Sequence, residues 1–157
     1  MEQNKDDYTA RISNASPLQL VVINFELIID NIHDAVSAYE AGNTESFAKH
    51  INSARDFLNL LMTSLDMSYS LSSDLMRVYI YVNGLLIKSD VLNSTKPARE
   101  ARKLLKVLLE SFRSLADLGS NDEPVMENAQ QIYAGLTYKD GKLSEYIMEE
   151  TDRGFKA

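Results

Sequence analysis

Apolar residues recur at spacings of three and four along most of this chain, which is the period of an amphipathic helix. Four long segments carry the pattern, and the scarce glycines and prolines fall mainly between them. The segments cover about residues 17–41, 45–65, 71–92 and 97–118. Because helices joined by short links bury their apolar stripes against one another, the pattern predicts an all-α fold, an antiparallel four-helix bundle.

Residues near the segment ends support these boundaries. Ser16 is a favourable N-cap, Pro17 suits the first helical position, and Gln19 completes a capping box. Gly42 suits the left-handed turn that ends a helix, and Thr44 is a candidate N-cap for the second helix. The first two helices are therefore expected to be joined by a short turn.

The two ends of the chain fall outside the bundle pattern. Residues 1–15 are polar and are expected to form a mobile N-terminal segment, whereas residues 16–119 form the bundle. Residues 120–157 are too apolar for a simple tail and too short for a second domain. Pro124 and Gly135 bracket a candidate short helix there, and we expect this C-terminal extension to pack on or near the bundle.

Composition excludes several classes of protein. The 157 residues include no cysteine, so neither disulfide bonds nor thiolate chemistry are available. Sixteen basic against 23 acidic residues give a net charge of −7, which does not favour nonspecific attraction to nucleic acid or anionic lipid. The N-terminus lacks the apolar stretch of a signal peptide, and no segment has the length and hydrophobicity of a membrane span. We therefore expect a cytoplasmic protein without membrane insertion.

The candidate catalytic and metal-binding patterns are incomplete. Asp30 and His33 have the acid-x-x-His spacing of di-iron bundles, but His50 has no acid three residues before it. Ser46 and Lys49 match a Ser-x-x-Lys spacing that lacks its usual partner motifs. We expect no catalytic residue, no metal, no cofactor and no enzymatic activity.

The most informative feature is an excess of apolar surface. Nine of the twelve residues from Leu18 to Ile29 are apolar, which is more than a helix with one solvated face needs. The next two helices show a similar surplus, which includes Phe57, Leu60, Met62, Met76, Tyr79, Tyr81, Leu86 and Ile87. Either the C-terminal extension covers this surface, or a groove rich in tyrosine and methionine receives an amphipathic or extended partner.

The fourth predicted helix is locally positive. Between Lys96 and Arg113 there are six basic and two acidic residues. A solvated helix face is the simpler interpretation, and docking of an acidic partner is the alternative.

Several stretches of the chain resemble the FliS-type export chaperones, which hold bacterial flagellin before secretion. Tyr8, followed by residues 14–20 (Asn-Ala-Ser-Pro-Leu-Gln-Leu), is similar to the opening of that family. Residues 61–69 (Leu-Met-Thr-Ser-Leu-Asp-Met-Ser-Tyr), with Tyr79 and Tyr81 further on, are similar to its second-to-third-helix region. The resemblance covers roughly residues 8–118.

Two departures from the family pattern stand out. Asn24-Phe25-Glu26 occupies the place of a Leu-Tyr-Asp-like run, which keeps a ring and an acid but loses a phenolic hydroxyl. Gly84-Leu85 replaces a pair of arginines, so a partner contact through that pair is not transferred to this chain.

The resemblance implies a chaperone that binds the disordered C-terminal segment of flagellin and prevents its premature polymerisation, without ATP. A component of the flagellar secretion gate is considered as a second partner. The N-terminal stretch of the family can lie over part of the client surface, which suggests this role for Tyr8 and Ile12. A helical adaptor that binds another amphipathic protein segment is the alternative function. The candidate partner-binding residues are Tyr8, Ile12, Met62, Leu65, Tyr69, Leu75, Tyr79, Val82 and Leu86.

Overall fold

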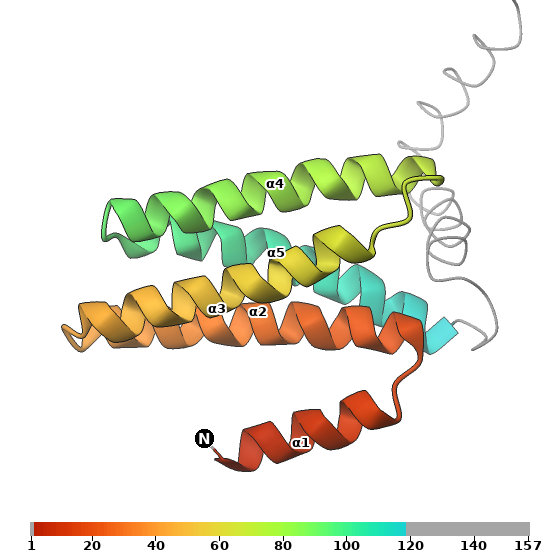
Figure 1. Cartoon of the computed structure of the whole chain (residues 1–157), viewed down its shortest axis with the longest axis horizontal. Coiled ribbons are helices and arrows are strands. Elements are labelled where there is room, and N and C mark those ends of the chain that lie inside the picture. Colours follow the sequence, from red (N-terminus) through yellow and green to blue (C-terminus); the bar gives the residue numbers. More distant parts are fainter. Residues whose placement is uncertain (1, 119–157) are drawn as a thin grey trace, which may run out of the picture.

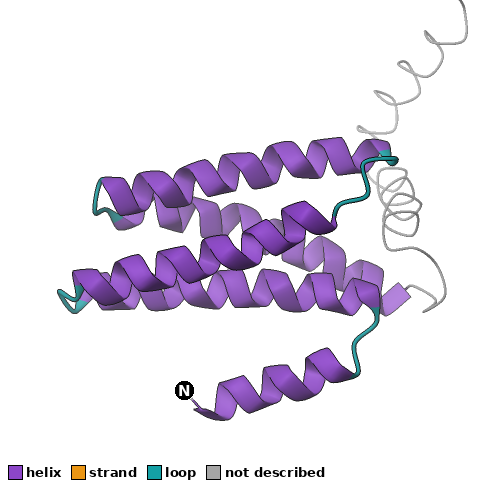
Figure 2. Ribbon diagram, in the orientation of Figure 1, coloured by secondary structure: helices purple, strands orange, loops and turns teal. Residues whose placement is uncertain are grey.

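The computed structural model describes residues 2–118, with side chains from Asp7 onward, and this part of the chain is almost entirely helical. Its helices are α1 (Glu2–Ser13), α2 (Pro17–Glu40), α3 (Thr44–Ser64), α4 (Ser70–Val91) and α5 (Thr95–Leu118) (Figures 1 and 2). Both α2 and α4 pack against α3 and α5, so α2 and α4 are diagonal in the bundle. The predicted all-α, antiparallel four-helix bundle is confirmed, and the expected C-terminal extension lies outside the described residues.

An additional helix, α1, lies alongside α2 (Figure 1). Residues 1–15 are predicted to be a mobile segment because most of them are polar, so their helical form is not expected from the sequence pattern. Tyr8 and Ile12 are one helical turn apart and therefore lie on the same face of α1.

Side-chain caps explain where the bundle helices begin. The predicted capping box of α2 is present: the Ser16 hydroxyl accepts the backbone N–H of Gln19 at 3.2 Å, and the side-chain Oε1 of Gln19 accepts the backbone N–H of Ser16 at 2.8 Å. For α3 the predicted cap is wrong by one residue, because the Asn43 side chain accepts the Ser46 amide at 2.9 Å and Thr44 is already helical. Gly42 supplies the expected left-handed residue, with φ of 76°.

The core of the bundle contains an aromatic trio that joins three helices. The ring of Phe25 on α2 lies 6.1 Å from that of Tyr79 on α4 and 5.3 Å from that of Phe112 on α5, measured between centroids. All three side chains are buried. Tilted aromatic pairs at these distances add about 0.5–1.5 kcal/mol each to the burial of their area.

Candidate protein-binding site

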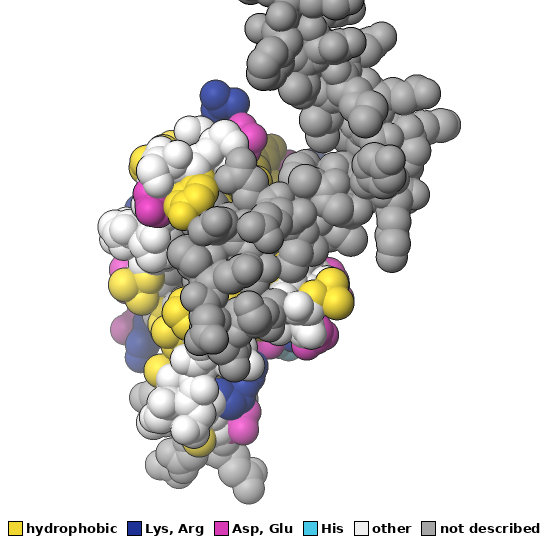
Figure 3. All heavy atoms as spheres, turned by 90° about the vertical axis from the view of Figure 1, so that its right-hand side faces the viewer, with side chains coloured by type: hydrophobic (Ala, Val, Ile, Leu, Met, Phe, Trp, Pro, Cys, Tyr) yellow, Lys and Arg dark blue, Asp and Glu magenta, His cyan; other side chains and the backbone are white. Residues whose placement is uncertain are grey.

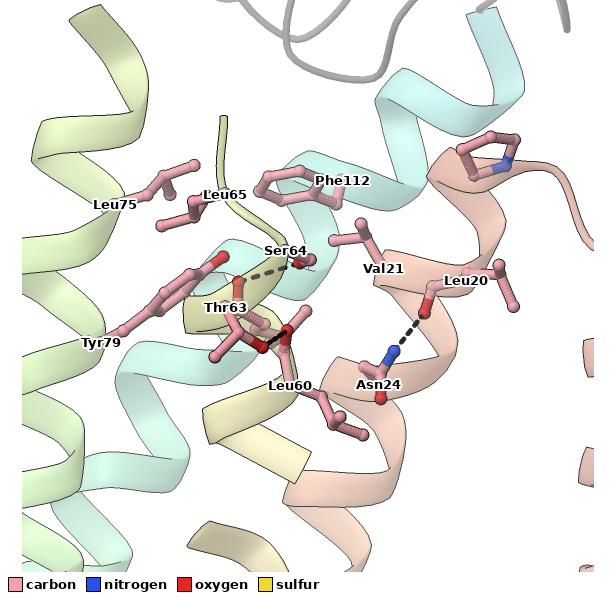
Figure 4. A pocket seen from close by; sticks show the side chains of 12 residues that line it. Leu20, Val21, Asn24, Leu60, Thr63, Ser64, Leu65, Leu75, Tyr79 and Phe112 are labelled. Carbon is pink, nitrogen blue, oxygen red and sulfur yellow. Dashed lines mark hydrogen bonds between the residues drawn. The ribbon is translucent and has the colours of Figure 1, made fainter. Parts of the chain in front are cut away.

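A pocket of about 510 Å³ opens at the end of the bundle where α2 and α4 begin and α3 and α5 approach their ends. We call it the end pocket. Figure 4 shows side chains from all four bundle helices converging on it. Figure 3 views the molecule from this end and shows hydrophobic side chains at the surface. The end pocket is lined by Pro17, Leu20, Val21, Asn24, Leu60, Leu61, Thr63, Ser64, Leu65, Leu75, Tyr79 and Phe112.

Among the described residues, none that lines the end pocket carries a charge. Three of its polar side chains are hydrogen-bonded to carbonyls of their own helices. Asn24 donates to Leu20 at 3.0 Å, Thr63 to Asn59 at 3.0 Å, and Ser64 to Leu61 at 2.9 Å (Figure 4 draws the first and the last). An occupant therefore meets mainly apolar surface, and the burial of its own apolar side chains drives its binding.

Tyr79 is the polar exception. Its side chain is 1% exposed, and burial raises the pKa of its phenol well above 10, so it stays a neutral donor. Among residues 2–118 its hydroxyl has no hydrogen-bond partner. No fully buried polar side-chain atom of the described residues is unpaired, so this hydroxyl is reachable from the pocket. The end pocket thus offers one donor among apolar walls.

Three of the residues predicted to bind a partner meet in the end pocket: Leu65, Leu75 and Tyr79. Met62 and Tyr69 are partly buried against the core and do not line it. Val82 and Leu86 are 0% exposed. The expectation that these two line an exposed groove is wrong in this structure, because they lie one and two turns deeper along α4 than the pocket, inside the core.

Sequence reasoning missed the α2 wall of the pocket. Leu20, Val21 and Asn24 lie in the apolar-rich stretch from Leu18 to Ile29. That stretch indicates more apolar surface than the core needs, but it does not indicate which of its residues line a pocket. Leu60 was part of the surplus on the next helix and is 55% exposed at the pocket. Phe112 lines the pocket from α5, where only its core stripe was recognised.

Tyr8 and Ile12 are separate from the end pocket, and none of the α1 side chains described from Asp7 onward lines it. The Tyr8 hydroxyl donates to the Asp30 carboxylate at 2.7 Å, and Arg11 pairs with Glu26 at 2.8 Å. Glu26 and Asp30 project from the side of α2 next to α5, whereas Leu20 and Asn24 face the pocket. Ile12 is 45% exposed. In this structure α1 therefore covers a different side of α2.

Glu26 is held by two cations. Arg11 and Arg113 approach its carboxylate at 2.8 and 3.0 Å. Burial alone pushes the pKa of Glu26 upward, but the hydrogen bonds from the two guanidinium groups outweigh it and lower the pKa overall. The two ion pairs of Glu26 therefore link α1, α2 and α5.

The positive face of α5 is partly neutralised. Arg99 pairs with Glu40 at 2.6 Å, and Arg113 pairs with Glu26 and with Glu110 at 3.2 Å. Arg102 donates to the Nδ1 atom of His33 at 3.3 Å. These contacts support the interpretation of a solvated face more than that of a docking site for an acidic partner.

Within residues 2–118, no cluster of three or more His, Cys, Asp or Glu side chains is arranged to hold a metal ion. No helix in that range combines the length and hydrophobicity of a membrane span.

The fold and the apolar pocket define an all-α helical bundle that can receive apolar side chains of another polypeptide segment at its end. The family model of the flagellar protein FliS matches residues 1–118, and the chain belongs to that family. Membership implies a role as a flagellar export chaperone, in a family of chaperones that is not known for enzymatic activity. A comparison with curated proteins finds no match. The resemblance seen in the sequence is thereby confirmed.

Proposed function

We propose that this chain holds the C-terminal segment of flagellin in the cytoplasm before export and keeps it from polymerising. The end pocket is the observation that carries this proposal. Its described walls are apolar and uncharged, and the Tyr79 hydroxyl, which has no hydrogen-bond partner among the described residues, is available to a backbone carbonyl of the bound segment. A disordered segment that orders on such a surface binds with moderated affinity, which suits a client that is later released.

We propose Leu65, Leu75 and Tyr79 as contacts of this client, with Leu20 and Leu60 added from the geometry of the pocket. Met62 and Tyr69 pack against the core outside the lining of the pocket. A component of the flagellar secretion gate remains a proposed second partner.

We also propose that α1 covers a second part of the client surface, along the side of α2 next to α5. Tyr8 holds α1 there through Asp30, and Ile12 is exposed on the same face of α1. Tyr8→Phe removes that hydrogen bond, so the peptide of flagellin should bind more tightly than to the wild type. Ala10→Ser, at an exposed position of α1, is the control. Equal or weaker binding to Tyr8→Phe contradicts this role of α1.

The test of the main proposal is calorimetric titration of the full chain with a peptide of the C-terminal segment of flagellin from the same organism. Binding near 1:1 with a strongly negative heat-capacity change is expected, since the peptide buries apolar surface as it orders. Leu60→Glu places a charge at the pocket and should weaken binding at least tenfold. Asn59→Glu places the same charge on the neighbouring exposed residue and is the control.

Absence of binding by a folded wild type contradicts flagellin as the client. The alternative is then a helical adaptor that receives an amphipathic segment of another protein, and affinity capture with the same Leu60→Glu control identifies that segment.

A further inference from the structure

The end pocket lies close to the point where the described part of the chain stops. Phe112 lines the pocket, and Leu118, the last described residue, follows it by less than two turns of α5. At 1.5 Å per residue this separation is only about 9 Å along the helix axis. The chain continues for the whole of residues 119–157.

A short linker is long enough to return to the pocket. Residues 119–123 (Gly-Ser-Asn-Asp-Glu) precede Pro124 and span up to about 17 Å when extended. That reach exceeds the distance from Leu118 back to the level of Phe112 along α5.

The sequence after the linker has the pattern that the pocket accepts. Val125, Ala129, Ile132 and Tyr133 recur at helical spacing between Pro124 and Gly135, so a helix there has one apolar face. The pocket offers apolar walls without charge, and the Tyr79 hydroxyl lacks a partner among the described residues. An apolar segment that brings a carbonyl or side-chain oxygen satisfies both features.

The other candidate within the chain is α1, and it is already engaged elsewhere. Tyr8 and Arg11 bind Asp30 and Glu26 on another side of α2. The family match ends at residue 118, so the segment that follows is an addition to the matched domain.

We propose that residues 124–134 of the same chain occupy the end pocket in the absence of a partner and are displaced when a partner binds. The docking of residues 124–134 is inferred from the lining of the pocket and from the sequence that follows α5. Only the identity of the displaced partner rests on the proposed function. The extension thereby acts as an intramolecular competitor.

The full chain allows a direct test because it has no cysteine, so Gln131→Cys gives one site for a nitroxide label. The label should broaden the methyl NMR signals of Leu60 and Leu75 at the pocket. It should leave the signals of Val91, at the opposite end of α4, unchanged. Adding Ile132→Asp to the labelled protein should abolish the broadening, whereas the matched Gln130→Asp, at a polar position, should retain it. Absence of broadening, or broadening that survives Ile132→Asp, overturns the proposal.

Peptide titration then separates this inference from the proposed function. If residues 124–134 fill the pocket in 80–90% of molecules, Ile132→Asp tightens binding of the flagellin peptide by roughly five- to tenfold relative to Gln130→Asp. Broadening without peptide binding by either variant supports the docking and contradicts flagellin as the client. Equal peptide binding by both variants overturns the competition and leaves the proposed function standing.

Discussion

Arg113, near the end of α5, donates a hydrogen bond of 3.0 Å to Glu26 on α2 across 87 residues of sequence. The same carboxylate receives Arg11 from α1 at 2.8 Å. One largely buried acid therefore joins the added helix to the bundle, and its protonation weakens both contacts.

Stability should fall in acid through Glu26. Its pKa is lowered in the folded protein, so the stabilisation is present above the unfolded value of 4.5 and is lost as the pH falls through the lower folded value. Glu26→Gln should reduce the free energy of unfolding by about 1–2 kcal/mol at pH 7. Thermal melts between pH 7 and 3 should show the difference between wild type and variant shrinking below pH 4.5. A difference that is independent of pH contradicts this assignment.

Removal of the central ring of the aromatic trio should destabilise the whole bundle. Phe25 is 0% exposed and contacts both Tyr79 and Phe112. Phe25→Ala should lower the free energy of unfolding by about 3–5 kcal/mol in urea titrations, because it leaves a cavity between three helices. Val107→Ala, at a side chain that is 67% exposed, should change it by less than about 0.5 kcal/mol.

The hydroxyl of Tyr79 should matter for binding and little for folding. Tyr79→Phe preserves the ring that packs on Phe25 and removes only a donor that has no partner among the described residues. In the Ile132→Asp background, where residues 124–134 do not compete for the pocket, loss of one hydrogen bond of about 1 kcal/mol should weaken binding of the flagellin peptide about fivefold in calorimetry. Tyr81→Phe is the matched control, because the Tyr81 hydroxyl donates to Glu100 on the surface, outside the pocket. Equal affinities for the two variants argue against a hydrogen bond from Tyr79 to the client.

Two glycines should respond in opposite directions to replacement by alanine. Gly84 lies inside α4, and a Cβ there meets no described atom within 4 Å, so Gly84→Ala should raise stability by about 0.5–1 kcal/mol. Gly42 has the same open space but a φ of 76°, which alanine adopts only with strain. Gly42→Ala should therefore lower the melting temperature. A destabilised Gly84→Ala variant indicates that something outside the described residues approaches α4 at that point.

The positions of the bundle helices could be predicted closely because their apolar stripes are long and regular. Their first residues were less certain where several cap-forming residues are adjacent. Asn43 caps α3 in place of Thr44, and α5 begins at Thr95, two residues before the proline expected to open it. Helix α1 was not predicted, because its sequence is polar and its described contacts to α2 come from distant residues such as Asp30 and Glu26.

The site could be predicted only in part. Leu75 and Val82 belong to the core stripe expected for this helix, and Tyr79 and Leu86 to the apolar surplus beside it, but this pattern does not separate pocket residues from core residues. The division comes from position along the helix axis: Leu75 and Tyr79 reach the open end, whereas Val82 and Leu86 are sealed by neighbouring helices. Likewise, Leu20 lines the pocket only because of how α2 is rotated about its own axis in the bundle. A surplus of apolar residues in the sequence does not specify that rotation.

Phe112 belongs both to the wall of the end pocket and to the aromatic trio of the core. The same side chain thus contributes both to the binding surface and to the folding core. Ligation and thermal resistance are linked, because an occupant at a hundred times its Kd adds about 2.7 kcal/mol to the free energy of unfolding. The chaperone is therefore expected to be most resistant to heat and proteolysis while loaded and to become more labile on delivery of its cargo.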